Sequence, residues 1–139
     1  MKAAVSTSKY PTVMIIDDNE IDNLINQKMM EGCGFADNVY INTGSKSALE
    51  FLSNLAMTYQ NMPAELIPKI IFLDINMPIL DGFQFLEAFA RLDADFRKGI
   101  RVVMLTVSTN PQEEKMAKSD PVVEAFMTKP LTEAMLATL

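Results

Sequence analysis

The chain has 139 residues, of which 49% are hydrophobic, so it suits one globular domain, because two domains of half this size would each bury too little surface. Its net charge of −6 argues against a nucleic-acid surface, which needs clustered lysine and arginine to neutralise phosphates. The chain has one cysteine and no histidine, so any bound metal must be held by oxygen ligands.

Two further exclusions concern the cysteine and the membrane. Cys33 lies between two glycines and is expected to be a small buried residue without a redox role. No apolar run reaches the roughly 18 residues of a membrane span, and the N-terminus has no apolar stretch of signal-peptide length. A cytoplasmic protein without membrane insertion is therefore expected.

The first half of the chain predicts two strand and helix pairs. An apolar run at residues 12–17 predicts a strand, and apolar residues at helical spacing then predict a helix over 19–32. These residues are Ile21, Leu24, Ile25 and Met29. A short second strand at 38–42 is followed by a second helix, marked by apolar residues from Ala48 to Tyr59.

The second half of the chain repeats this alternation. Strands are predicted at 69–74, 101–106 and 122–129. Helices are predicted from Gly82, from Asn110 and from Leu131, the second with Asn110 as its cap and Pro111 in its first turn. Alternating strands and helices of this kind are typical of a parallel sheet covered by helices on both faces.

Four of the five predicted strands end on residues that can do polar chemistry. These endings are Asp17-Asp18, Asp74, Thr106 and Lys129. In a doubly wound parallel sheet all strands end at one edge, where ligands bind, so the four endings are expected to meet in one cleft. Three carboxylates there would repel one another, and a hard cation such as Mg²⁺ is the natural partner.

A hydroxyl and an ammonium group beside these carboxylates indicate phosphoryl chemistry, because both can stabilise phosphoryl oxygens. A carboxylate next to the metal can then act as nucleophile and carry the phosphoryl group as an acyl phosphate. Asp74 is best placed for this role, since it is a single acid at the end of a central strand. Asp17 and Asp18 form a pair suited to sharing one cation.

Four stretches resemble the receiver domain of two-component response regulators, including the stand-alone receivers of chemotaxis and phosphorelays. They are "IIDDNE" (15–20), "FLDINMPILDGFQFL" (72–86), "MLT" (104–106) and "FMTKPL" (126–131). The resemblance implies a receiver domain over residues 11–139, preceded by a flexible tail of residues 1–10. It also implies an α/β, flavodoxin-like fold, with a doubly wound parallel sheet of five strands in the order 2-1-3-4-5.

The resemblance further assigns the acceptor and the metal ligands. Asp74 matches the phosphoacceptor, which receives a phosphoryl group from a histidine kinase or a histidine phosphotransfer protein. Asp17 and Asp18 match the acidic pair that binds Mg²⁺ together with Asp74. The backbone carbonyl of Asn76 matches a further ligand.

The remaining matched residues imply a phosphorylation-activated switch. Thr106 and Lys129 match the pair that contacts the phosphoryl group, and Phe126 matches the aromatic switch residue. The bond between Lys129 and Pro130 is expected to be cis by the same resemblance. The face formed by the fourth helix, fifth strand and fifth helix would then change shape for a downstream protein, which makes the chain a signalling switch more than a dedicated enzyme.

Three positions are expected to tune the chemistry. Val107 follows the switch threonine, where the family usually has a small residue, so it is expected to crowd access to the phosphoryl group. Asn76 and Ser108 hold positions that tune hydrolysis in the family. Slow phosphotransfer or slow hydrolysis is the expected consequence of the valine.

Three alternative functions remain open. A phosphatase of the haloacid dehalogenase type also uses a strand-ending aspartate with Mg²⁺, but it needs a second acid two residues later, where this chain has Asn76. A receiver-like binding module that is never phosphorylated would have the same fold. The chain could also be the receiver fragment of a longer regulator with an output domain.

Overall fold

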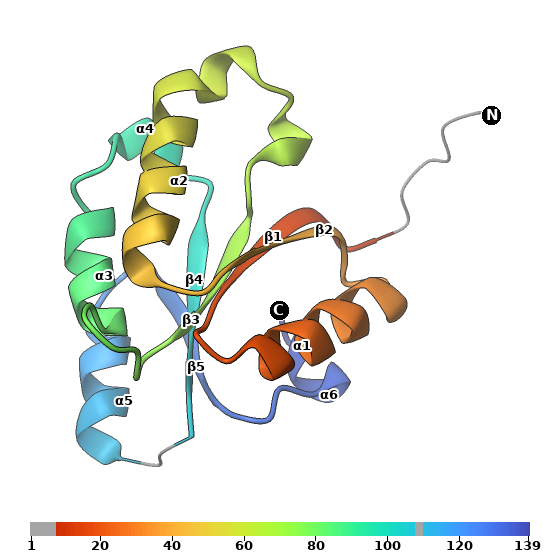
Figure 1. Ribbon diagram of the computed structural model, residues 1–139, viewed down its shortest axis with the longest axis vertical. Coiled ribbons are helices and arrows are strands. Elements are labelled where there is room, and N and C mark those ends of the chain that lie inside the picture. Colours follow the sequence, from red (N-terminus) through yellow and green to blue (C-terminus); the bar gives the residue numbers. More distant parts are fainter. Residues whose placement is uncertain (1–7, 108–109) are drawn as a thin grey trace.

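A computed structural model of the chain describes residues 8–107 and 110–139. Five parallel strands form one sheet in the order β2-β1-β3-β4-β5 (Figure 1). The strands are β1 (Tyr10–Ile16), β2 (Ala36–Asn42), β3 (Ile70–Asp74), β4 (Arg101–Thr106) and β5 (Val123–Thr128). This confirms the predicted flavodoxin-like order.

Within residues 8–107 and 110–139, five α-helices lie between consecutive strands, and a sixth follows β5. They are α1 (Glu20–Gly32), α2 (Ser45–Thr58), α3 (Gly82–Phe89), α4 (Ala94–Arg97), α5 (Pro111–Lys118) and α6 (Glu133–Leu136). All five predicted helices are present, the fourth as α5 and the fifth as α6, whereas α4 and two short 3-10 helices at Tyr59–Asn61 and Ala64–Leu66 were not predicted. Over the described ranges, no helix combines the length and apolar character that crossing a membrane requires.

Helices cover both faces of the sheet, as predicted. Successive β1 residues point to opposite faces, so Met14 and Ile16 join one buried cluster while Val13 and Ile15 join another. The first cluster lies under α2, α3 and α5, and the second lies under α1 and α6 (Figure 1). The sheet edge that carries the strand ends is therefore held between two packed layers.

The start of the sheet corrects the predicted tail. β1 begins at Tyr10, and the backbone N–H of Lys9 already donates to the carbonyl oxygen of Gly34 at 2.9 Å. The predicted tail of residues 1–10 therefore extends too far into the chain. Residues 1–7 lie outside the described residues.

The side of α1 that packs on the sheet differs from the apolar side that revealed the helix. Its buried residues are Asn23, Asn26 and Met30. Ile21, Leu24 and Ile25 are 71%, 51% and 59% exposed. The apolar spacing correctly predicted a helix, but it did not predict which side faces the core.

Cys33 corrects another expectation, because it is exposed and not buried. It is the C-cap of α1, and its backbone N–H donates to the carbonyl oxygen of Met29 at 2.9 Å. Gly34 then turns the chain with a φ of 76°, in the left-handed region that favours glycine. The cysteine therefore sits at the surface where the helix ends.

The short α6 is held by tertiary contacts. A helix of four residues is marginal on its own. Leu131, Leu136 and Leu139 are buried against the sheet, and the hydroxyl of Tyr10 donates to the carbonyl oxygen of Leu139 at 2.6 Å. Arg101 in turn donates to the Tyr10 hydroxyl at 2.8 Å, so the last turn of the chain is tied to β1 and β4.

Candidate functional site

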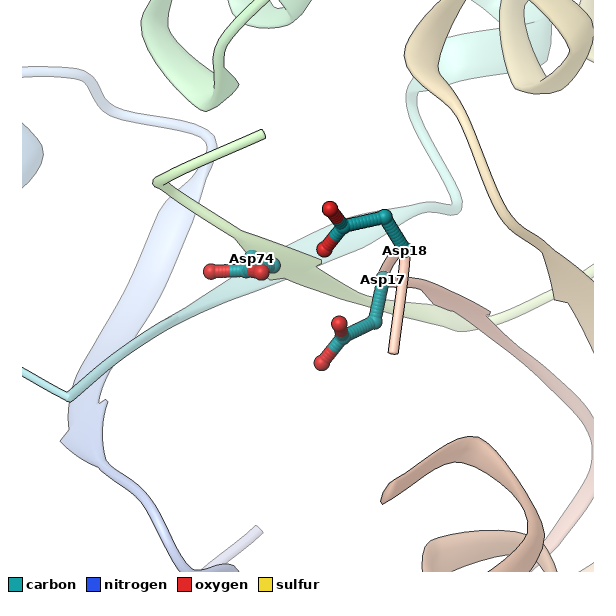
Figure 2. A group of neighbouring side chains, drawn as sticks. All are labelled: Asp17, Asp18 and Asp74. Carbon is teal, nitrogen blue, oxygen red and sulfur yellow. The ribbon is translucent and has the colours of Figure 1, made fainter. Parts of the chain in front are cut away.

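Three carboxylates meet where β1 and β3 end. Asp17 and Asp18 follow the last residue of β1, and Asp74 is the last residue of β3. These two strands are paired side by side, which brings their ends together. Each of the three residues offers an oxygen within 4.8 Å of the others, and Figure 2 shows the side chains grouped at the sheet edge. Asp17 and Asp74 are buried, whereas Asp18 is exposed.

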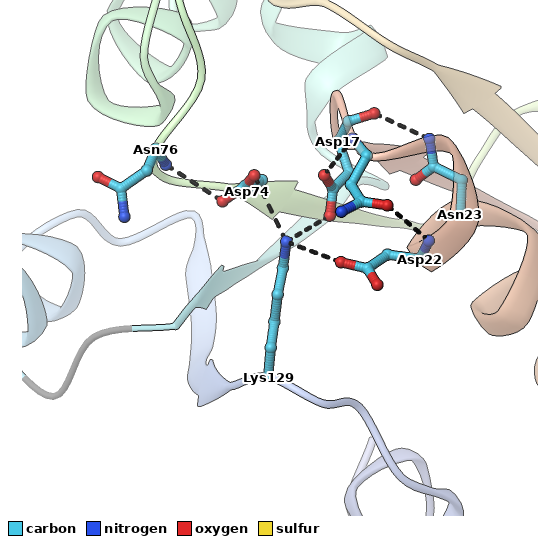
Figure 3. Close-up of polar contacts among 7 residues, drawn as sticks. Asp17, Asp22, Asn23, Asp74, Asn76 and Lys129 are labelled. Carbon is cyan, nitrogen blue, oxygen red and sulfur yellow. Dashed lines mark hydrogen bonds and ion pairs between the residues drawn. The ribbon is translucent and has the colours of Figure 1, made fainter.

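Lys129 reaches the same group from the end of β5. Its Nζ lies 2.5 Å from Asp17 Oδ2, 3.4 Å from Asp74 Oδ2 and 3.8 Å from Asp22 Oδ2 (Figure 3). Its backbone N–H donates to the carbonyl oxygen of Thr106 at 2.8 Å, which joins the ends of β4 and β5. The Lys129-Pro130 bond is cis, as the resemblance implied.

The two remaining predicted switch residues lie on the neighbouring strands. Thr106 ends β4 and is fully buried, one residue beyond Leu105, which pairs with Asp74 in the sheet register. Phe126 pairs with Met104 and packs, half buried, against the cluster under α2, α3 and α5. The structure thus places Thr106 on β4, beside the strand that carries Asp74, and Phe126 on the edge strand next to it.

The electrostatics of the cleft are dominated by negative charge. The pKa of Asp74 is raised to about 6, mainly by burial and also by the charge of Asp17, although Lys129 and the backbone N–H of Asn76 both act to lower it. Burial alone would lower the pKa of Lys129, but its hydrogen bond to Asp17 and the charges of Asp74 and Asp17 leave that pKa raised. The single positive charge of Lys129 therefore does not balance the negative charges of the carboxylates in the cleft.

Backbone and amide groups hold the two buried carboxylates in place. The N–H of Asn19 donates to Asp17 Oδ1 at 2.9 Å, and the N–H of Asn76 donates to Asp74 Oδ1 at 3.1 Å. The side-chain amide of Asn23 donates to the carbonyl oxygen of Asp17 at 2.8 Å. These bonds orient the acids without neutralising them.

Gly82 is required by the close approach of α3 to the end of β3. A Cβ atom at this position would lie 2.9 Å from Ile75 Cα and 3.1 Å from the carbonyl oxygen of Asp74. Asp81, the cap of α3, forms a reciprocal capping box with Gln84, which fixes where the helix begins. The end of β3, at Asp74 and Ile75, therefore lies directly against the first turn of α3.

Val107 and Asn76, two of the three positions expected to tune the chemistry, are exposed at the ends of β4 and β3. Val107 is 73% exposed and lines a pocket of about 300 Å³ together with Asp22 and Lys129. Asn76 is exposed, two residues after Asp74. Ser108 lies outside the described residues. Val107 lies next to Lys129 in this pocket, and its expected crowding of the phosphoryl group stays a prediction.

Two residues of the site were not predicted from the sequence. Asp22 forms an ion pair with Lys129, and Asn23 holds the backbone of Asp17. Both lie in the first turns of α1, close in sequence to the acidic pair. The sequence shows that both residues lie at the start of the predicted helix. The direction of their side chains depends on how α1 packs on the sheet, which the sequence does not show.

The donor set fits a hard divalent cation. Three carboxylates offer oxygens close together, and the chain contains no histidine. Mg²⁺ prefers such oxygen ligands, and the excess negative charge of the cleft would favour its binding. The arrangement also leaves one buried carboxylate, Asp74, next to an ammonium group that can pair with a phosphoryl oxygen.

Comparison with known proteins gives the family. The family model described as the response regulator receiver domain matches residues 13–139. Response regulator Rcp1 of Synechocystis is 27% identical over 117 residues, which cover 84% of this chain and 75% of that protein. The sensor histidine kinase GacS of Pseudomonas protegens is 27% identical over 132 residues, which cover 94% of this chain but only 13% of the kinase.

A solved structure agrees with this result. The crystal structure of a two component response regulator from Cytophaga hutchinsonii matches with a TM-score of 0.80 and 26% identity, over 94% of this chain and 93% of that one. The family model spans all five strands except the first residues of β1, and it includes every strand end that contributes to the site. The chain therefore belongs to the response regulator receiver domain family and is a receiver domain of two-component signalling.

Proposed function

We propose that the chain is a phosphorylation-activated switch in which Asp74 accepts a phosphoryl group from a phosphohistidine. The donor would be a histidine kinase or a histidine phosphotransfer protein. The observation that carries this proposal is the placement of the Asp74 carboxylate, buried and 3.4 Å from the Lys129 amine, beside two further carboxylates. A cytoplasmic location and a role as a switch, not as a dedicated enzyme, belong to the same proposal.

Mg²⁺ is the proposed cofactor. Asp17, Asp18 and Asp74 would hold it with carboxylate oxygens, and the backbone carbonyl of Asn76 would be a further ligand. When bound, the ion supplies positive charge that neutralises the acids and the incoming phosphoryl oxygens. The negative excess of the cleft described above supports this assignment.

The proposed reaction is a direct phosphoryl transfer. A carboxylate oxygen of Asp74 bonds to phosphorus while the bond from phosphorus to the histidine nitrogen breaks, and the nitrogen keeps that electron pair. Lys129 then pairs with a phosphoryl oxygen, and the Thr106 hydroxyl donates a hydrogen bond to another. Water later cleaves the acyl phosphate and regenerates the Asp74 carboxylate and inorganic phosphate.

The proposed output is a change on the face formed by α5, β5 and α6. Movement of Thr106 toward the phosphoryl group would free space into which Phe126 turns. The bond from the Lys129 N–H to the Thr106 carbonyl supports such coupling, because it links the two strand ends that would respond. A downstream protein would recognise the changed face.

Intact-protein mass spectrometry tests the proposal. The wild-type chain is incubated with acetyl phosphate and Mg²⁺, and separately with acetyl phosphate and a chelator. A gain of one phosphoryl mass that requires the metal, located at Asp74 by fragmentation, is expected. If no adduct forms and beryllofluoride does not bind, the chain acts as a receiver-like binding module that is not phosphorylated.

The exposed side of α1 supports a protein as the donor. Ile21, Leu24 and Ile25 are more than half exposed, and Ile25 lines the same pocket as Lys129 and Val107. Exposed apolar residues that adjoin a reactive site are typical of a protein contact surface. A helix that carries the phosphohistidine could pack on this surface and place its phosphoryl group over the cleft.

Ile25→Asn tests this surface. We expect transfer from a phosphorylated histidine phosphotransfer protein to slow by about ten-fold, because a buried isoleucine contributes about 1.5–3 kcal/mol to a contact. Labelling by acetyl phosphate should stay unchanged, since the small donor needs no contact with α1. Met57→Asn, on α2 and 81% exposed in the free chain, is the matched control. Equal slowing with both donors would argue against a docking role.

A further inference from the structure

Lys129 has one more carboxylate partner than the proposed chemistry uses. Two of its partners, Asp17 and Asp74, belong to the proposed metal and phosphoryl site. The third is Asp22, whose Oδ2 lies 3.8 Å from the lysine Nζ. In Figure 3 the amine stands between Asp74 on one side and Asp22 on the other.

The backbone of Asp22 is anchored at the start of α1. It lies in the first turn of α1, and its backbone N–H donates to the side-chain oxygen of Asn19 at 3.0 Å. The backbone N–H of Asn19 donates in turn to Asp17 Oδ1. The backbone of Asp22 is therefore tied through Asn19 to the acidic pair, and its carboxylate lies within 3.8 Å of the Lys129 amine.

Asp22 also borders the solvent. Its side chain is 40% exposed, against 11% for Lys129, and it lines the pocket that opens onto the lysine. A phosphoryl oxygen on Asp74 must attract the Lys129 amine while Asp22 attracts it from the other side. A cation in the cleft gains from the same charge, because Asp22 adds to the surrounding negative potential.

We propose that Asp22 is a positioning residue that lowers the affinity of this site for a phosphoryl-like anion and raises its affinity for Mg²⁺. It does so by drawing the Lys129 amine away from Asp74 and by adding one negative charge at the mouth of the cleft. This inference rests on the proposed phosphoacceptor function. It names a residue that tunes the site without contacting the phosphoryl group.

Two dissociation constants measured on Asp22→Asn test the inference. We expect the Kd for Mg²⁺, from isothermal titration calorimetry, to rise about three-fold, as for loss of a partly exposed charge interaction. The Kd for beryllofluoride at saturating Mg²⁺ should fall about three-fold, because Lys129 is released toward the anion. Both changes should shrink at high salt, since exposed charges are screened.

Two further variants make the result specific. Glu20→Gln removes the other acid from the first turn of α1 and should change neither constant by as much. Asp22→Glu keeps the charge and should restore both constants toward the wild-type values. If Asp22→Asn weakens both ligands, or if Glu20→Gln gives the same shifts, the inference is wrong. If the wild-type chain binds neither ligand, the proposed function itself fails.

Discussion

Asp74→Asn is expected to abolish phosphoryl incorporation and, at the same time, to stabilise the metal-free fold. The loss of labelling follows because the amide cannot act as the nucleophile. The gain in stability follows from the pKa of Asp74, which burial raises from 3.8 to about 6. At about 1.4 kcal/mol per pKa unit, ionised Asp74 destabilises the metal-free fold by up to about 3 kcal/mol.

The pH dependence of this gain has a definite sign. Above pH 6 the carboxyl is ionised in both the folded and the unfolded chain, so the full penalty applies and asparagine removes it. Between pH 6 and pH 4 the folded chain takes up a proton that the unfolded chain does not, and the penalty disappears. We expect Asp74→Asn to raise the free energy of unfolding by about 1–2 kcal/mol at pH 7. This is less than the full penalty, because the asparagine has no charge to pair with Lys129.

Urea denaturation at pH 7 and pH 4 measures this effect without Mg²⁺. Asp95→Asn, which makes the same change at an exposed position of α4, is the control and should shift the unfolding free energy by less than about 0.5 kcal/mol. Two results would contradict this charge balance. One is an Asp74→Asn variant that is less stable than the wild type at pH 7, and the other is a gain in unfolding free energy that persists at pH 4. Retained labelling of Asp74→Asn would place the acceptor elsewhere.

The fold was largely predictable because apolar strands in a doubly wound sheet are buried on both faces. The residues of β3 and most of β4 are fully apolar before their last residue, and both were predicted to within one residue. The strand order came from the resemblance, not from periodicity. α4 was not predicted, because a helix of four residues is too short to show a periodic pattern of apolar residues.

The candidate site was predictable in its main residues for a related reason. Asp17, Asp74 and Lys129 stand out because a charged residue at the end of a strand in a doubly wound parallel sheet is expected at the ligand-binding edge. Asp22 and Asn23 carry no such signal, since polar residues in the first turn of a helix usually face solvent. The exposure of Ile21 and Ile25 was missed for the same reason as these two polar residues. The spacing of apolar residues predicts a helix but does not show which side of α1 packs on the sheet.

Lys129→Met is expected to destabilise the metal-free fold by about 2–4 kcal/mol, the opposite sign to Asp74→Asn. Asp17 is fully buried and has the Lys129 amine at 2.5 Å, so removal of the amine leaves a buried carboxylate uncompensated. Labelling by acetyl phosphate should fall about 100-fold, because a charged donor to the transferring phosphoryl group is lost.

Mg²⁺ should restore much of the lost stability of Lys129→Met. A cation that binds the folded chain stabilises it by mass action, and the variant site, with one positive charge fewer, should bind it more tightly. Thermal unfolding with increasing Mg²⁺ measures the restoration. The control is Lys118→Met, which breaks the exposed pair with Glu114 and should change stability by less than about 1 kcal/mol, with no added response to Mg²⁺.

These two variants together separate the roles of the cluster. If Lys129 and Asp74 act on stability through the same buried charge balance, Asp74→Asn should recover part of the stability that Lys129→Met loses, and the effects will not be additive. Additive effects would mean that Lys129 stabilises the fold through Asp17 alone. In that case the 3.4 Å contact with Asp74 matters only once Asp74 carries the additional charge of a phosphoryl group.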